Sequence, residues 1–142
     1  MSALIQFFVE EISYTLTHEK EIGEWIEKVI REEGFTPGFV NYILCNDNYL
    51  LELNQKYLGR DTLTDVIAFD YSEEDGEVSG DVFISVERTA ENAESFGVSA
   101  EEELHRVIVH GTLHLCGYDD HNQDDKTLMT GKEDKYLSLL PF

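Results

Sequence analysis

The sequence predicts an α+β fold, in which a small mixed β-sheet of about four strands packs with about five helices. Short β-rich segments and longer segments of helical periodicity are interspersed without the strict alternation of a parallel α/β protein. The length of 142 residues suits one domain, residues 1–142, with a hydrophobic core of its own. We expect a monomer.

The first half of the chain predicts two strands and two helices. Residues 5–9 are apolar and read as a short strand. A stripe of apolar residues predicts a helix over 19–33, with Thr17 as its cap. The continuous β-rich run 39–46 predicts a buried strand, and a helix follows over 47–57.

Two further strands are predicted at 65–71 and 81–85. The acidic, glycine-containing segment between them predicts a turn, so the two strands are close enough to pair antiparallel. A helix follows over 86–96 and ends at Gly97.

The last two helices are separated by a glycine. Ser99 and Glu102 have the spacing of a capping box, which predicts a helix from there to Leu115. Gly117 ends that helix, and a final helix covers 124–139. The helix before Gly117 is expected at the centre of the fold and carries the residues of greatest chemical interest.

The net charge of −20 comes from 30 acidic and 10 basic residues. This balance argues against loose binding to nucleic acid, whose phosphates favour Lys and Arg. Most of the acids are expected to form a solvating surface, and any nucleic-acid function needs its few cations gathered near the site. No apolar run approaches the ~20 residues of a membrane span, and the two cysteines, Cys45 and Cys116, suggest reduced thiols.

Two histidines in "VIVHGTLHLCGYDDH" point to a metal site on the central helix. His110 and His114 lie four residues apart on one helix face, a spacing that lets two imidazoles reach one ion. Gly117 then lets the chain turn sharply, so that a third ligand can fold back. Asp120 and His121 compete for this role.

Two arguments about the third ligand disagree: ligand chemistry favours His121, and sequence spacing favours Asp120. Histidine is the commoner zinc ligand, which favours His121. The reach of the turn after Gly117 favours Asp120, which we expect to be the ligand, with His121 as its alternative or as a supporting partner. Asp119 is a candidate for orienting an imidazole. Three protein ligands leave one position open, which is typical of catalytic zinc; nickel or another divalent metal is an alternative.

The signature His-Glu-x-x-His of metallopeptidases places a general base directly after the first histidine. Gly111 occupies that position here. A peptidase would therefore need a base from elsewhere in the chain, which weakens that hypothesis.

Several motifs together resemble the YbeY endoribonuclease (rRNA maturation factor) family. "HGTLHLCGYDDH" is similar to its signature, His-Gly-x-Leu-His-Leu-x-Gly-Tyr-Asp-His. "LNQKYLGRDTLTDVIAFDY", "GDVFIS" and "MTGKEDKYL" resemble further segments of the family, so the resemblance spans roughly residues 50–140. It implies a cytoplasmic, zinc-dependent endoribonuclease that cuts single-stranded RNA and acts in 16S rRNA 3′-end maturation and ribosome quality control.

The chain departs from the family pattern at two places that matter for the site. The family's third zinc ligand is a histidine six residues after the second, where this chain has Asp120. The family arginine that follows the tyrosine is matched by Leu58, so Arg60 is the candidate that supplies this charge for binding or cleaving RNA. A guanidinium suits phosphate because it is planar, always charged and bidentate.

Three functions compete. The first is a metal-dependent endoribonuclease, with Arg60 or Lys56 holding a phosphate and no general base assignable from the sequence. The second is a metal-dependent hydrolase of peptides or small molecules. The third is a ribosome-associated binding module with a structural metal. The acidic charge is an argument for basic ribosomal proteins or a ribosome-associated GTPase as partners.

Overall fold

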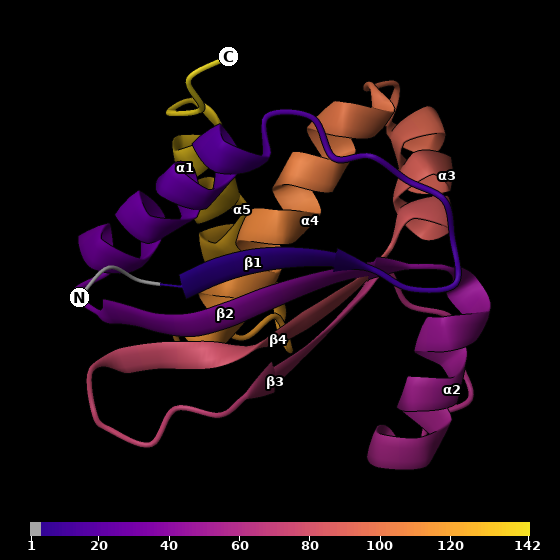
Figure 1. The fold of residues 1–142 in the computed structure, drawn as a ribbon, viewed down its shortest axis with the longest axis horizontal. Helices are drawn as coiled ribbons and strands as arrows, with labels where there is room; N and C mark the ends of the chain where they lie inside the picture. The colour runs from indigo at the N-terminus through magenta and orange to yellow at the C-terminus, as the bar shows by residue number, and fades with distance from the viewer. Residues whose placement is uncertain (1–3) are drawn as a thin grey trace.

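The fold contains a four-stranded mixed sheet, as the sequence predicts (Figure 1). The computed structural model describes residues 4–142. The strands lie in the order β1-β2-β4-β3, with β1, β2 and β4 parallel and β3 antiparallel to β4. Their bounds are β1 Leu4–Val9, β2 Thr36–Cys45, β3 Val66–Asp70 and β4 Glu77–Ser85.

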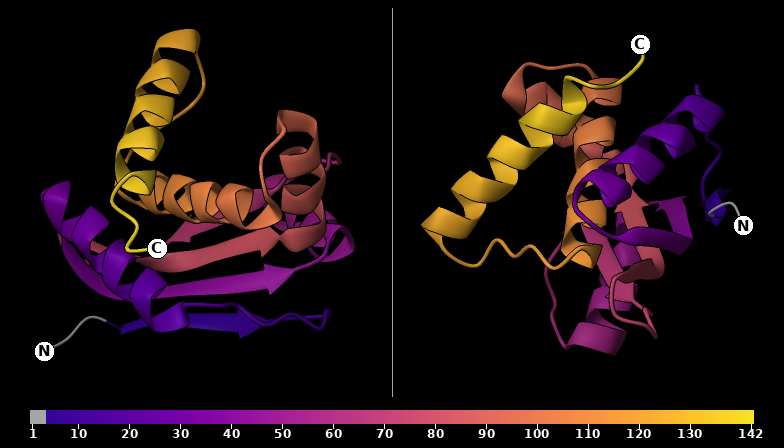
Figure 2. Two further views of the ribbon diagram at one scale, coloured as in Figure 1. Left: turned by 90° about the horizontal axis from the view of Figure 1, so that it is seen from above. Right: turned by 90° about the vertical axis from the view of Figure 1, so that its left-hand side faces the viewer.

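Five helices accompany the sheet: α1 Glu19–Glu32, α2 Asp47–Leu58, α3 Val86–Phe96, α4 Ala100–Leu115 and α5 Gln123–Leu137. Helices α1, α3, α4 and α5 gather on one side of the sheet, and α4 lies between the others (Figure 2). The predicted α+β class with its mixed sheet is confirmed, and helix α4 carries two residues of a possible metal-binding grouping. Within the described residues, none of the helices combines the length and the apolar character needed to span a membrane.

Helix α4 is central because its inner face is part of the main core. The predicted stripe of Leu104, Val107 and Ile108 is buried there. The hydroxyls of Thr112 on α4 and Tyr42 on β2 lie 2.5 Å apart in the same interior, so helix and sheet are also joined by a hydrogen bond. On another face of α4, His110 and His114 line a cleft together with residues of β3.

Helix α2 packs on the opposite face of the sheet. Leu50 of α2 is fully buried against Cys45 and Ile67, in a second and smaller core cluster. Both cysteines are free and buried, as expected for small hydrophobic side chains.

Two local predictions need correction. The cap of α1 is His18, not Thr17; the Thr17 hydroxyl donates to Glu101 at 3.5 Å instead. The expected turn before 81–85 is shorter than predicted, because β4 already begins at Glu77. Backbone pairing with β2 extends the strand beyond its hydrophobic part, a long-range effect that local composition does not encode.

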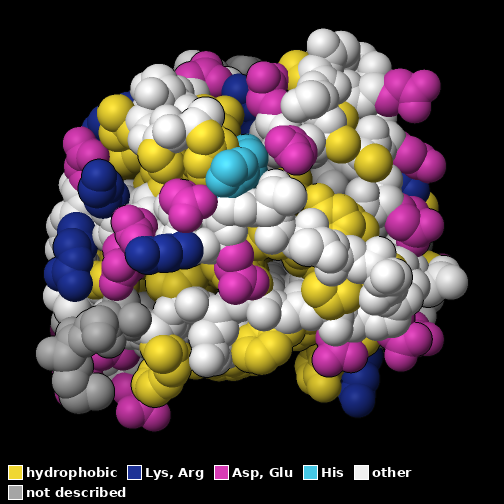
Figure 3. Space-filling view, turned by 45° about the horizontal axis from the view of Figure 1, so that its top comes forward, with side chains coloured by type: hydrophobic (Ala, Val, Ile, Leu, Met, Phe, Trp, Pro, Cys, Tyr) yellow, Lys and Arg dark blue, Asp and Glu magenta, His cyan; other side chains and the backbone are white. Residues whose placement is uncertain are grey.

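Acidic side chains are dispersed over the face drawn in Figure 3 rather than gathered in one place. This distribution is what a solvating surface requires, because spacing like charges apart reduces their mutual repulsion.

Two helical glycines provide a test of how closely α4 lies on the sheet. A Cβ at Gly111 would lie 2.6 Å from Val82 Cγ1, whereas a Cβ at Gly131 of α5 would meet nothing within 4 Å. We expect Gly111→Ala to lower the free energy of unfolding by about 1–3 kcal/mol through overpacking. Gly131→Ala should raise it by up to about 1 kcal/mol through helix propensity. Urea denaturation measures both changes in the free energy of unfolding. Changes of the same sign in the two variants would contradict the close approach of α4 to the sheet at Gly111.

Candidate metal centre

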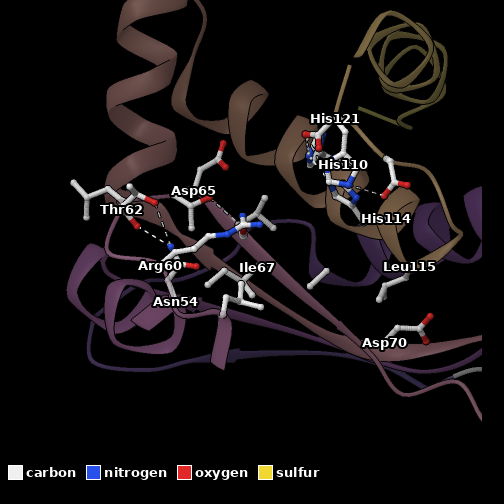
Figure 4. Close-up of a pocket in the computed structure, with 17 residues that line it drawn as sticks. Asn54, Arg60, Thr62, Asp65, Ile67, Asp70, His110, His114, Leu115 and His121 are labelled. Atoms are coloured by element: carbon white, nitrogen blue, oxygen red, sulfur yellow. Dashed lines mark hydrogen bonds and ion pairs between the residues drawn. The ribbon is translucent and has the colours of Figure 1, made fainter. Parts of the chain in front are cut away.

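His110 and His114 project from α4 into a cleft with their Nε2 atoms facing each other at 3.0 Å (Figure 4). Their spacing of four residues stacks them on successive turns of the helix. The buried side of the same turns holds them in place, since Ile108 and Thr112 are fully enclosed.

Asp120 joins the two histidines because the chain reverses after α4. Gly117 has a φ of 103°, and the N–H of Tyr118 donates to the Leu113 carbonyl at 3.1 Å. This is the glycine-dependent helix ending that the sequence predicts. It returns the chain so that Asp120 Oδ2 lies 3.6 Å from His110 Nε2 and 3.9 Å from His114 Nε2.

The three ligand atoms are spaced as a shared ion requires. All lie within 4.8 Å of one another. Ligands at ~2.0–2.1 Å from a tetrahedral zinc are separated by roughly 3.3 Å, close to the observed 3.0, 3.6 and 3.9 Å. Residues 4–142 thus contain a possible His/His/Asp metal-binding site.

The hydrogen bonds made by the Nδ1 atoms of His110 and His114 determine whether their Nε2 atoms are free to bind a metal. His114 Nδ1 lies 2.9 Å from the Tyr118 carbonyl oxygen, which only accepts hydrogen bonds. His110 Nδ1 lies 2.6 Å from a Glu133 carboxylate oxygen. Each Nδ1 therefore carries the proton, and in the neutral ring each Nε2 presents a lone pair. Two lone pairs and a carboxylate oxygen converge on one point, an arrangement that fits a cation.

Glu133 is itself held by an arginine. Its side chain is 8% exposed, and Arg106 Nη1 lies 3.0 Å from Oε1, the oxygen not used by His110. Arg106 also pairs with the exposed Asp134 at 2.7 Å. Buried carboxylates persist when paired and hydrogen-bonded in this way. Neither Glu133 nor Arg106 was predicted from the sequence to have a role at the site.

The electrostatics of the two histidines differ. Burial lowers the pKa of His114, and the nearby His110 lowers that pKa further. Burial also lowers the pKa of His110, but the hydrogen bond and charge of Glu133 outweigh burial, so the His110 pKa is raised. The ring beside Glu133 is therefore the one more readily protonated when no other cation is bound.

The histidines and Asp120 form one wall of a cleft of about 510 Å³. Arg60 lies across this cleft, on the side of Asn54 and Thr62 (Figure 4). None of the ion pairs formed within residues 4–142 involves Arg60. The structure therefore places the guanidinium at the same cleft as the candidate metal ligands.

His121 also borders the cleft but is not part of the grouping of ligand atoms found among residues 4–142. Its side chain is 76% exposed, and its Nε2 lies 3.6 Å from Asp119 Oδ1. Asp119, a candidate for orienting a metal-bound imidazole, thus lies beside His121, while Glu133 and the Tyr118 carbonyl hold the rings of His110 and His114.

Gly111 faces the sheet, not the cleft. Because a side chain at this position would point at Val82, a carboxylate there would enter the core. A base placed as in the metallopeptidase signature is incompatible with this packing.

The chain is similar over nearly its whole length to proteins of one family. The sequence model of the family described as Endoribonuclease YbeY matches residues 5–141. The chain belongs to this family. Membership confirms the resemblance seen in the sequence and the enzyme class that it implied, a hydrolase of the endoribonuclease type.

Relatives from the YbeY family cover almost the whole chain. Endoribonuclease YbeY of Flavobacterium psychrophilum is 52% identical over 93% of this chain and 94% of its own length. The protein of the same name from Cytophaga hutchinsonii is 43% identical over 97% and 96%. The solution structure of a Thermotoga maritima protein is similar with a TM-score of 0.65 and 31% identity, covering 96% of this chain and 89% of that one.

The contact between Glu133 and His110 should tune metal affinity. We expect Glu133→Gln to weaken binding of Zn²⁺ about 10–100-fold, because the ring loses the charged acceptor that orients it and raises its basicity. Competition with a chromophoric chelator measures the affinity. Asp134→Asn is the matched control, since it removes the other carboxylate bound to Arg106 without touching the ring. Equal effects of the two substitutions would show that Arg106, not the ring contact, matters.

Proposed function

We propose that this protein is a zinc-dependent endoribonuclease specific for single-stranded RNA, acting in 16S rRNA 3′-end maturation and ribosome quality control in the cytoplasm. The observation that carries the proposal is the convergence of His110 Nε2, His114 Nε2 and Asp120 Oδ2 in a cleft that also contains an arginine. Its family membership supplies the substrate class.

Zinc is the proposed metal because two imidazoles and one carboxylate form a donor set that zinc accepts, with a position left for substrate or water. His110, His114 and Asp120 are the proposed ligands, and His121 is the alternative third ligand. Nickel binds similar donors and is the alternative ion.

The chain's own residues have defined parts in this proposal. A divalent ion bound here supplies Lewis-acid chemistry, stabilising charge on a phosphoryl oxygen and making water a better nucleophile. Glu133 and the Tyr118 carbonyl keep the protons of the two rings on Nδ1. With Nδ1 donating and Nε2 directed at the ion, neither His110 nor His114 has a nitrogen left to accept a proton from the nucleophile.

Arg60 is proposed to hold a phosphate next to the scissile one. Among the described residues that line the cleft, it is the only Lys or Arg. Lys56, the other candidate from the same segment, does not line the cleft, and its Nζ lies 5.3 Å from the centre of the Tyr57 ring. A bidentate guanidinium positions a phosphodiester more firmly than an ammonium group.

The charge of −20 bears on how RNA reaches the site. Long-range repulsion between protein and RNA disfavours a free encounter. We propose that basic ribosomal proteins or a ribosome-associated GTPase bind the acidic surface and present the RNA, with the enzyme acting as a monomer.

One observation favours a peptide substrate as the second candidate. β3 is an edge strand, and its residues Val66, Ile67 and Ala68 line the cleft beside the histidines. An extended peptide could pair with such an edge. The packing of Gly111 removes the usual position of the peptidase base, so we place this function second.

The substrate is tested by incubating zinc-loaded protein with a single-stranded RNA spanning the 16S 3′ end, the same RNA annealed to its complement, and casein. We expect cleavage of the single strand only, because bases that are paired in a duplex cannot be splayed out into the cleft. His110→Ala, which removes one proposed ligand, is the control against contaminating nucleases and should abolish cleavage. Cleavage of casein without cleavage of RNA would reverse the order of the two candidates.

Arg60→Ala should lower kcat/KM for the single-stranded RNA by about 10–100-fold, which corresponds to losing one charge-assisted phosphate contact of about 1.5–3 kcal/mol. Zinc content should stay the same, because Arg60 lies across the cleft from the ligands. Arg31→Ala, an exposed arginine at the end of α1, is the matched control for overall charge. Equal losses in both variants would indicate a non-specific effect of charge.

A further inference from the structure

A buried carboxylate, Glu33, contacts the bend that follows α4 and has no part in the proposed chemistry. Glu33, the residue after α1, has a side chain that is 5% exposed. Tyr118 donates its hydroxyl proton to Glu33 Oε1 at 2.5 Å, and Lys132 Nζ lies 3.0 Å from Oε2. The hydroxyl of Tyr136 donates to Oε2 as well. The cluster therefore joins the end of α1, the bend after α4, and α5.

The carboxylate is charged within this cluster. Burial raises the pKa of Glu33, but the hydrogen bonds from Tyr118, Tyr136 and Lys132 outweigh burial, and the net pKa is lowered. A charged acceptor binds its donors more strongly than a neutral one. Glu33 therefore restrains the three segments to which Tyr118, Lys132 and Tyr136 belong.

Tyr118 connects this anchor to the metal grouping. Its hydroxyl is fixed by Glu33, and its backbone carbonyl accepts the proton of His114 Nδ1 at 2.9 Å. The next residues along the chain lead to Asp120, the proposed third ligand. Lys132 adds a second restraint, since its Nζ lies 5.6 Å from the centre of the Tyr118 ring.

We infer that Glu33 is a positioning residue: through Tyr118 it holds the bend that orients His114 and delivers Asp120 to the ion. The inference rests on the proposed metal site. Gly117 permits the bend but does not fix it, because glycine is the least restricted residue. A ligand donor delivered by a flexible bend loses affinity through the entropy of ordering it, and the Glu33–Tyr118 hydrogen bond removes that freedom in advance.

The competing explanation is that the cluster only fastens α1 to α5. Tyr136 allows the two explanations to be distinguished. Like Tyr118 it donates its hydroxyl to Glu33, but it belongs to α5. Its carbonyl accepts from Trp25 Nε1 at 2.8 Å and not from a proposed metal ligand. Tyr118→Phe and Tyr136→Phe therefore remove equivalent hydrogen bonds with different consequences for the bend.

The experiment measures zinc affinity by chelator competition, together with the visible absorption of the Co²⁺-substituted full-length protein and the urea midpoint of the metal-free form. We expect Tyr118→Phe to weaken zinc about tenfold, the lower end of the range for groups that support ligands, and to alter the Co²⁺ spectrum. Tyr136→Phe should lower the urea midpoint while leaving zinc affinity within about twofold. In Glu33→Ala the added substitution Tyr118→Phe should have no further effect on affinity.

Equal zinc affinities in Tyr118→Phe and the parent would overturn the inference, and so would equal losses in Tyr118→Phe and Tyr136→Phe. The underlying metal site is checked separately with His110→Ala. If that variant binds zinc as tightly as the parent, the proposed ligand set is wrong, and the inference is overturned with it. If His110→Ala loses zinc while Tyr118→Phe does not, only the role of Glu33 is wrong.

Discussion

The Nε2 atoms of His110 and His114 face each other at 3.0 Å in this structure, with a carboxylate oxygen of Asp120 beside them. Lone pairs brought this close repel one another, and only a proton or a cation between them turns the contact into an attraction. While both rings are neutral, the hydrogen bonds to Glu133 and to the Tyr118 carbonyl keep the single proton of each ring on Nδ1, so each Nε2 presents a lone pair. The surrounding structure therefore sustains an arrangement whose natural complement is a positive ion.

The fold meets this constraint by giving α4 two different environments. Its buried face, which includes Ile108 and Thr112, is fixed in the core, so the backbone positions that carry His110 and His114 are fixed as well. The groups that orient the rings come from outside the helix, from α5 and from the bend after α4. Helix α5 thus acts on the site through Glu133 as well as covering α4, and the Glu33 cluster extends the same support to the bend.

The sequence predicted those features of the site that depend on local spacing. His110 and His114 follow from the period of the helix, and the reversal that brings Asp120 back follows from Gly117. Glu133 and Glu33 could not be found in this way, since they lie 23 and 85 residues from His110 and Tyr118, the residues they contact. Nothing in the local pattern distinguishes them from the many acids of a solvated surface. The fold shows the same division: element types follow from periodicity, whereas the early start of β4 comes from pairing with a distant strand.

The charge of the proposed third ligand, Asp120, and the net charge of the whole chain both affect how strongly the site attracts RNA. The proposed third ligand, Asp120, would cancel one unit of an ion's charge, whereas the histidine of the family pattern would cancel none. In the proposed function the remaining attraction for a phosphate would then depend more heavily on Arg60, which lines the same cleft. At physiological salt the Debye length is about 8 Å, so most of the surface charge is screened from a strand already seated in the cleft. Repulsion acts chiefly on the approach of RNA, while its retention is governed by a few groups at close range. A net charge of −20 is therefore compatible with an RNA-cleaving centre, and it is the reason for proposing basic proteins as partners.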